Sequence, residues 1–136
     1  MIDKLTLTKP LIALNIQSIA TNTTTVGNVI DRQGYQSAVL ALLSGTITDG
    51  TYTPLLEESS DNSTYTAVAD ADLLPAGTGQ EAAIALILTD DNVIEKIGYR
   101  GNKRYLRLSI VSAGTTTGGT IGAVAILGDP NLAPIA

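Results

Sequence analysis

Residues 37–58 read SAVLALLSGTITDGTYTPLLEE and carry the strongest structural signal in this chain. Apolar and β-branched side chains lie on both sides of Asp49-Gly50, a residue pair typical of a tight turn between two strands. The stretch therefore predicts a β-hairpin with one strand over residues 37–47 and a second over residues 52–58.

The expected register of this hairpin places Ile47 opposite Tyr52, which sorts the threonines to one side and the apolar groups to the other. Pro54 lies inside the second strand and has no N–H to donate. We therefore expect this strand at a sheet edge or with a bulge near Gly45, the residue on the facing strand.

Further short strands are expected on either side of the hairpin, separated by turns rich in Gly, Asn, Asp and Pro. The other expected strands span residues 11–20, 25–30, 64–68, 81–88, 93–99, 104–112 and 121–127. Residues 81–88 have good helix propensity but are assigned to a strand because the run is short and lies among strands. In residues 104–112 the alternation is clear, and Leu106, Leu108 and Ile110 are predicted to point inward.

Roughly eight or nine strands at intervals of about 8 to 12 residues predict an all-β, antiparallel β-sandwich or jelly roll. The 136 residues fit a single domain. Residues 1–10 end in Lys9-Pro10 and are expected to form an extended N-terminal arm. Residues 129–136 are expected to form a C-terminal tail that either docks or stays loose.

The chain contains neither cysteine nor histidine, which limits the chemistry it can perform. Disulfides, thiol nucleophiles, zinc-thiolate sites and Ser-His-Asp arrangements are excluded. We therefore expect no enzymatic activity, no cofactor and no metal. Paired carboxylates offer an alternative, Ca²⁺ binding or acid-base catalysis, but turn formation explains these residues better. The acidic positions are Glu57-Glu58, Asp61, Asp70, Asp72 and Asp90-Asp91.

The formal net charge is -5, but the basic residues are not spread evenly. Arg100, Lys103, Arg104 and Arg107 form a basic cluster, and Asp129 is the single acid that follows them. The overall acidity argues against general nucleic-acid binding. We predict that this cluster contacts a protein partner; ordinary solvated charges, or single-strand binding with tyrosine stacking, are the alternatives.

Nothing in the sequence indicates a membrane segment or a secretion signal. The longest apolar run, residues 82–88, is far shorter than the roughly 20 residues needed to cross a bilayer. The expectation is a soluble protein made in the cytoplasm of its host, with no membrane contact.

Four segments, taken together in this order and spacing, resemble the virion proteins of tailed bacteriophages. They are SGTITDGTY (44–52), EESSDNSTY (57–65), IGYRGNKRYLR (97–107) and GAVAILGDP (122–130). Within that class the chain resembles head decoration proteins, also called cement proteins, which bind the outside of an assembled capsid. None of the four segments is a catalytic signature.

The resemblance implies a rigid β-sandwich, a homo-oligomer and specifically a trimer, on the capsid surface. Its partner would be the major capsid protein or another virion protein. Residues 1–30 would then supply an edge for strand addition. The alternatives are a tail or head-tail connector protein and a carbohydrate-binding module that uses exposed tyrosines, with an enzyme as the third class.

Overall fold

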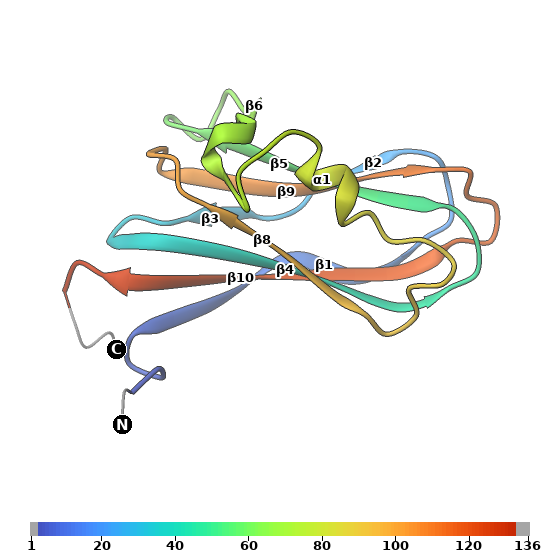
Figure 1. Cartoon of the computed structure of the whole chain (residues 1–136), viewed down its shortest axis with the longest axis horizontal. Helices are drawn as coiled ribbons and strands as arrows, with labels where there is room; N and C mark the ends of the chain where they lie inside the picture. The colour runs from blue at the N-terminus through green and yellow to red at the C-terminus, as the bar shows by residue number, and fades with distance from the viewer. Residues whose placement is uncertain (1–2, 133–136) are drawn as a thin grey trace.

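The computed structural model describes residues 3–132 and shows two antiparallel sheets packed face to face (Figure 1). Sheet A has the strand order β1 (Thr8–Ile19), β10 (Gly119–Pro130), β4 (Tyr35–Ile47), β8 (Ile94–Tyr99) and β7 (Leu73–Leu74). Sheet B has the order β2 (Thr24–Thr25), β9 (Tyr105–Ala113), β5 (Thr51–Ser59) and β6 (Thr66–Ala67), with β3 (Val29–Asp31) also on β9. The predicted all-β sandwich is confirmed.

The core lies between the two sheets, where alternate side chains of the long strands meet. Leu106, Leu108 and Ile110 of β9 are each at most 1% exposed, as their alternation predicts. Each fully buried aliphatic side chain stabilises the fold by about 1.5–3 kcal/mol. The opposite sheet contributes Leu14, Leu40, Leu42, Ile121 and Leu127.

The two strands predicted over residues 37–58 both form, but the predicted hairpin pairing is wrong. β4 pairs with β10 and β8 in sheet A, whereas β5 pairs with β9 and β6 in sheet B. Gly50 has a φ of 92°, so its glycine is needed for a left-handed backbone, as predicted. The chain nevertheless crosses from one sheet to the other at this point.

Tyr52 explains why the chain crosses between the sheets. Its side chain is completely buried, and its hydroxyl donates to the carbonyl oxygens of Ile19 (3.1 Å) and Asp49 (3.0 Å). This side chain fills the end of the sandwich, so β5 must leave the plane of β4. Ile47, also buried, lies on the other sheet, and the predicted register between Ile47 and Tyr52 is not formed.

Asp49 ties this crossing to the loop that precedes β10. Its carboxylate accepts hydrogen bonds from the backbone N–H groups of Thr116 (3.1 Å), Thr117 (2.9 Å) and Gly118 (2.8 Å) and from the Thr116 hydroxyl. The hydroxyl bond from Thr116, followed by the backbone bonds, holds the pKa of Asp49 well below its ordinary value. The charged carboxylate therefore helps to hold this end of the sandwich.

We expect the protein to lose stability in acid partly through Asp49. The folded-state pKa lies below the unfolded value of 3.8. The contribution of the Asp49 carboxylate to the stability of the fold is therefore complete above pH 3.8 and is lost as the pH falls through the folded-state pKa. In Asp49→Asn, the urea midpoint should fall less between pH 5 and pH 2.5 than in the wild type. Asp129→Asn, an exposed control, should fall like the wild type; equal falls in all three proteins would contradict this role.

A further local prediction is wrong. Residues 81–88 do not form a strand: α1 (Gln80–Ala83) is a single helical turn, and only Leu86 pairs, with Tyr52. The helix propensity of the alanines prevails there, and Glu81 accepts the N–H of Leu56 at 2.6 Å. The last strand is longer than the expected residues 121–127, because β10 runs from Gly119 to Pro130.

Both ends of the chain take part in sheet A over more residues than predicted. Residues 8–10 of the expected arm pair with residues 126–128 of β10, so residues 3–7 are the described part that precedes the sheet. Residues 129–130 of the expected tail close β10. Residues 1–2 and 133–136 lie outside the described part, and a role of these ends toward a partner stays a prediction.

A short 3-10 turn, η1 (Asp70–Asp72), lies between β6 and β7. Across residues 3–132, no helix has the length and apolar character required to cross a membrane.

Candidate functional site: the outer face of sheet A

The outer side of sheet A is built from the side chains that alternate with the core residues. In β4, Leu40 and Leu42 are buried, so Val39, Ala41 and Leu43 must point outward. The same alternation applies to β10, β8 and the first half of β1. We call this set the apolar face: Pro10, Ile12, Ile16, Val39, Ala41, Leu43, Leu74, Ile94, Val124 and Ile126.

The apolar face is unusually hydrophobic for the solvent side of an antiparallel sheet, which is normally polar. Ile16 is 78% exposed, Ile94 65% and Ile12 61%. Among the strand residues that the structure describes, Lys96 is the one charged residue that alternation places on this face. Single exposed aliphatic residues are ordinary, but a contiguous group of them marks an interaction surface.

Two hollows lie on this face. The smaller, of about 350 Å³, lies among residues of β1, β10 and β4, with Ile12, Ile16 and Leu43 in its wall. A bulge bends β1 so that Ile16 lies over Gly122, where a Cβ would approach Ile16 Cγ1 to 2.6 Å. Gly122 thus allows this close approach.

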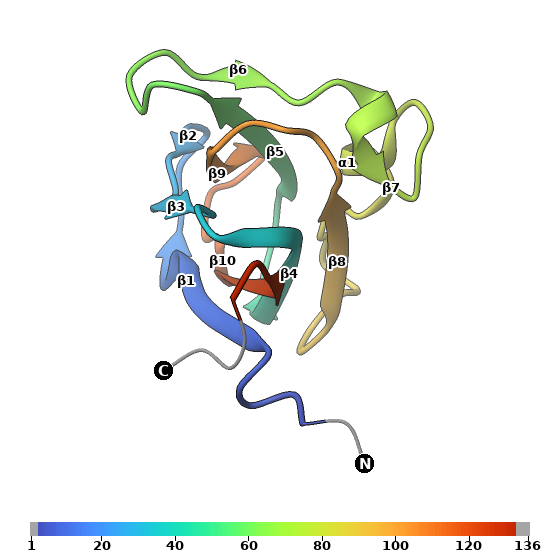
Figure 2. The same ribbon diagram turned by 90° about the vertical axis from the view of Figure 1, so that its left-hand side faces the viewer.

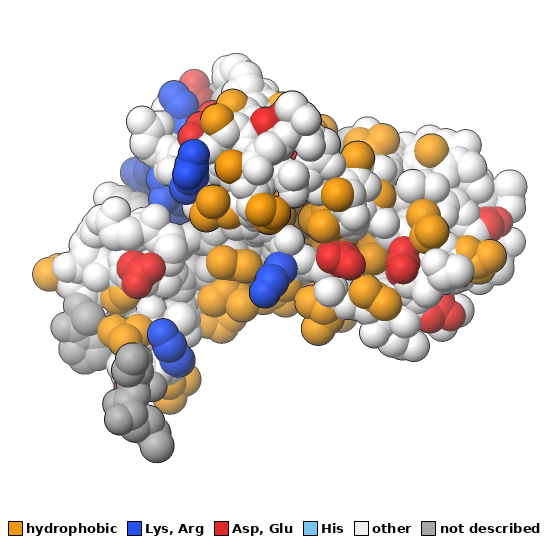
Figure 3. All heavy atoms as spheres, in the orientation of Figure 1, with side chains coloured by type: hydrophobic (Ala, Val, Ile, Leu, Met, Phe, Trp, Pro, Cys, Tyr) orange, Lys and Arg blue, Asp and Glu red, His pale blue; other side chains and the backbone are white. Residues whose placement is uncertain are grey.

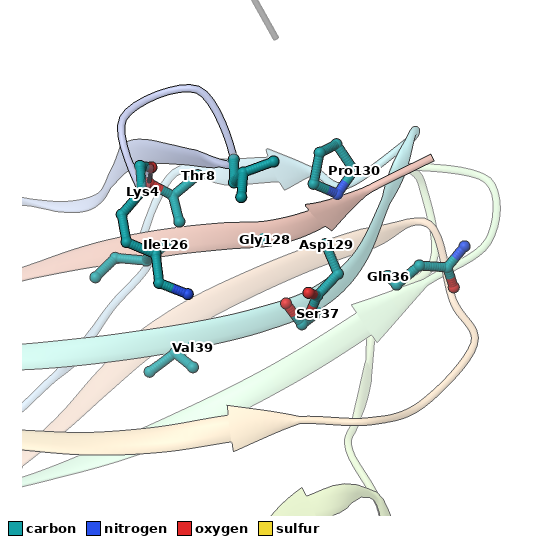
Figure 4. A pocket seen from close by; sticks show the side chains of 10 residues that line it. Lys4, Thr8, Gln36, Ser37, Val39, Ile126, Gly128, Asp129 and Pro130 are labelled. Atoms are coloured by element: carbon teal, nitrogen blue, oxygen red, sulfur yellow. Dashed lines mark hydrogen bonds between the residues drawn. The ribbon is translucent and has the colours of Figure 1, made fainter. Parts of the chain in front are cut away.

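The larger hollow, of about 560 Å³, lies at the end of the sheet near the termini. Figure 4 shows Val39 and Ile126 of the apolar face in its wall, with Lys4 and Thr8 from the N-terminal segment beside them. Asp129 also lines it. The apolar face is therefore indented in its middle and at one end.

The edge of sheet A at β1 is poorly suited to strand addition. Alternation directs the backbone groups of Pro10 and Ile12 to the outside, and Pro10 has no N–H. The Asn28 side chain donates to the Ile12 carbonyl at 3.1 Å, and the Asn28 N–H donates to the Ala13 carbonyl at 2.7 Å. β1 lies at the sheet edge (Figure 2), but strand addition through residues 1–30 stays a prediction.

The edge of sheet B at β5 is also protected. Leu86 pairs with Tyr52, Pro54 has no N–H, and the Glu81 carboxylate accepts the Leu56 N–H. β6 pairs with β5 at residues 57–58, beyond Pro54. At Pro54 itself β5 is therefore a sheet edge, and a proline fits there because no neighbouring strand needs its N–H. These two edges are thus protected, whereas the apolar face is exposed.

The predicted basic cluster lies elsewhere, at the end where β8 connects to β9, and its charges are partly compensated. Arg104 forms two bonds to Asp31, Nε–Oδ1 at 2.9 Å and Nη2–Oδ2 at 2.8 Å. Arg107 pairs with Glu57 at 2.9 Å and stacks over the Tyr65 ring at 4.1 Å. Figure 3 shows Lys and Arg gathered at this end among acidic side chains.

The other two members of the basic cluster are held in a rigid loop. Arg100 is exposed, and its Nε donates to the Ala71 carbonyl at 2.8 Å. The Lys103 N–H donates to the Tyr99 hydroxyl at 3.0 Å. Arg32 stacks over the Tyr99 ring at 5.0 Å and donates to two loop carbonyls. Arg100 and Lys103 are thus the cations of the cluster without a carboxylate partner within residues 3–132.

Three of the acidic positions, Asp61, Asp90 and Asp91, accept hydrogen bonds from backbone N–H groups. Asp61 accepts the N–H groups of Ser63 and Thr64, both at 2.9 Å, and these bonds lower its pKa to about 2. Asp90 and Asp91 accept backbone N–H groups of Ile87 and Ile47. Among the described residues, no group of three or more His, Cys, Asp or Glu could hold a metal ion.

The tyrosines offer little support for a carbohydrate platform. Tyr52 and Tyr99 are buried, at 0% and 2% exposed. Tyr35, Tyr65 and Tyr105 are half-buried, and the last two carry stacked arginines. Glycan binding by stacking requires an exposed aromatic ring, and none of the five tyrosines presents one in this state.

Sequence reasoning missed the apolar face, although a signal was present. Residues 38–43 read AVLALL and residues 122–127 read GAVAIL. A strand with a polar outer side shows alternation, whereas an unbroken apolar run indicates a strand that is apolar on both sides.

Comparison with known proteins identifies a similar fold. No protein-family model matches this chain, and no curated protein matches it. The solved structure of the PBSX exported protein XepA is similar, with a TM-score of 0.56 and 17% sequence identity. The similarity covers 91% of this chain and 38% of that one, so this chain spans well under half of that protein. At this identity the likeness shows the fold alone.

Proposed function

We propose that this chain is a non-enzymatic structural protein of a bacteriophage virion. Within that class we propose a head decoration protein, which binds the major capsid protein on the outside of the assembled capsid. The observation that carries the proposal is the apolar face: a rigid sandwich presents a contiguous, indented hydrophobic surface while its sheet edges are protected. Such a surface serves binding.

The similarity of fold to the PBSX exported protein XepA is compatible with the general class. The four segments that resemble tailed-phage virion proteins support it. The finer assignment to the capsid surface rests on that resemblance and on the shape of the molecule. We propose that copies of the chain also associate with one another, which gives a lattice-binding protein several points of attachment.

In this proposal the apolar face serves association between copies of the chain, and the basic loop with Arg100 and Lys103 supplies the contact with the capsid. Tyr99 and Arg32 hold the loop rigid, so binding a carboxylate-rich partner would cost little ordering entropy. The remaining cations, Arg104 and Arg107, already neutralise Asp31 and Glu57. We therefore expect Arg100 and Lys103 to contact the acidic partner, with Arg104 and Arg107 holding the surrounding strands.

Co-sedimentation with undecorated capsids of the same phage tests this function. The wild-type chain should bind, and binding should weaken as salt rises, because exposed charge pairs are screened. Changing both Arg100 and Lys103 to Gln should weaken binding by roughly tenfold and flatten the salt dependence.

The matched control is Lys9→Glu, which makes the same change in net charge at the other end of the chain. It should bind like the wild type. A wild-type chain that remains in the supernatant would rule out capsid decoration, and equal losses in this control and in the double variant would rule out the basic loop as the contact.

A further inference from the structure

We propose that the apolar face is occupied by a second copy of this chain, in a two-fold symmetric dimer with the two sheets A packed against each other. The biological purpose of this dimer rests on the proposed structural role. Dimer formation itself is a property of the isolated protein. Four observations carry it: the relief of the face, its area, its charge and the protected edges.

The relief of the face is self-complementary. Ile94 projects from β8, 65% exposed, beside its pairing partner Leu43 of β4. The hollow of about 350 Å³ lies on the other side of Leu43, toward β10 and β1. A two-fold axis near Leu43 places Ile94 of each copy over the hollow of the other. Such reciprocal contact is what a two-fold interface requires.

The area of the face suits a reversible dimer. Four strands about 4.8 Å apart and a run of about seven residues at roughly 3.3 Å each give a flat face of roughly 450 Å² per copy. Two copies bury about twice that area, close to the roughly 1,000 Å² at which specific interfaces begin. Leu74 at one margin, 42% exposed, adds to this area. We therefore expect a dissociation constant in the micromolar range.

The charge distribution favours contact through this face. The chain carries a net charge of -5, so two copies repel each other wherever carboxylates meet. The strand residues in the middle of the outer face of sheet A include no carboxylate, and Asp129 lies at its end, in the larger hollow. Lys96 can extend its flexible stem along the apolar surface and keep its ammonium group at the rim.

The protected edges exclude the main alternative geometry, a dimer formed by joining sheets edge to edge. Pro10 and Asn28 occupy the outer edge of β1. Pro54 and Glu81 do so at β5. At β8, Glu95 and Lys96 place charges along an edge that β7 covers in part. Packing of face on face is therefore the arrangement the molecule permits.

Sedimentation velocity of the full chain from about 1 to 500 µM tests the proposal. The wild type should pass from monomer to dimer, and Ile94→Asp should remain a monomer throughout the range. Val29→Asp is the matched control: Val29 is 44% exposed on β3 of sheet B, and the change adds the same charge. This control should dimerise like the wild type.

Circular dichroism and urea unfolding establish that the variants fold, as expected for substitutions at exposed side chains. Ile12→Asp, on the far side of the hollow, is a second test and should also give a monomer. A wild type that stays monomeric, a trimer as the phage resemblance implies, or a dimer unaffected by both substitutions would each overturn the proposal.

The salt dependence of dimer formation and that of capsid binding test this inference and the proposed function separately. A dimer held by apolar contact should persist in about 1 M NaCl, whereas capsid binding through Arg100 and Lys103 should weaken. Capsid binding by a protein that never dimerises would remove the dimer and leave the decoration role. A dimer that resists salt and does not bind capsids would remove the decoration role and leave the dimer.

Discussion

Replacing Gly27 with alanine is expected to prevent the sandwich from closing. A Cβ at Gly27 would lie 2.0 Å from the Leu108 carbonyl oxygen and 2.5 Å from the Ala13 carbonyl oxygen. Neither carbonyl can retreat, because Leu108 is paired within sheet B and the Ala13 carbonyl accepts the Asn28 N–H at 2.7 Å. Gly27 thus lies where the chain passes between strands of the two sheets. We expect a loss of at least about 4 kcal/mol in the free energy of unfolding.

Gly34→Ala is the control for this prediction. Gly34 has a φ of 90°, so alanine is strained there, but no atom lies within 4 Å of the added Cβ. The expected cost is about 1–2 kcal/mol from backbone strain alone. Urea unfolding followed by circular dichroism measures both variants. If Gly27→Ala were as stable as Gly34→Ala, the close contact of Gly27 with the two carbonyls would not matter to the fold.

Local patterns predicted most strands but could not identify their partners. The alternation of Leu106, Leu108 and Ile110 depends on neighbouring residues alone, so it was readable. The pairing around Asp49-Gly50 was not, because a tight turn suits both a hairpin and a crossing between sheets. The buried Tyr52, whose hydroxyl reaches the Ile19 carbonyl, selects the crossing. That contact joins residues 33 positions apart and has no local signature.

The same limit explains the basic cluster. Its residues are close in sequence and were read as one positive patch. The carboxylates that compensate them come from far away: Asp31 is 73 positions from Arg104, and Glu57 is 50 positions from Arg107. Sequence reasoning could therefore find the cations but not their partners, and it could not separate the two paired arginines from Arg100 and Lys103.

The hydroxyl of Tyr99 holds the basic loop in place. It donates to Glu58 Oε2 at 2.6 Å and accepts the Lys103 N–H at 3.0 Å, while the ring is only 2% exposed. Burial raises the pKa of Tyr99 well above its ordinary value, and the bond to Glu58 raises it further. The hydroxyl therefore stays protonated and can donate at any physiological pH.

Tyr99→Phe should accordingly cost about 2 kcal/mol of unfolding free energy, because it leaves Glu58 and the Lys103 N–H without this partner. Capsid binding should fall as well, although no charge is removed, since the loop that carries Arg100 and Lys103 loses its anchor.

Tyr35→Phe is the matched control: within the described part of the chain its hydroxyl makes no hydrogen bond, so the change should cost less than about 0.5 kcal/mol. Urea unfolding and co-sedimentation measure the two effects separately. A Tyr99→Phe variant as stable as the control would show that the hydroxyl bonds do not stabilise the fold. Unchanged capsid binding in a destabilised variant would separate loop rigidity from partner binding.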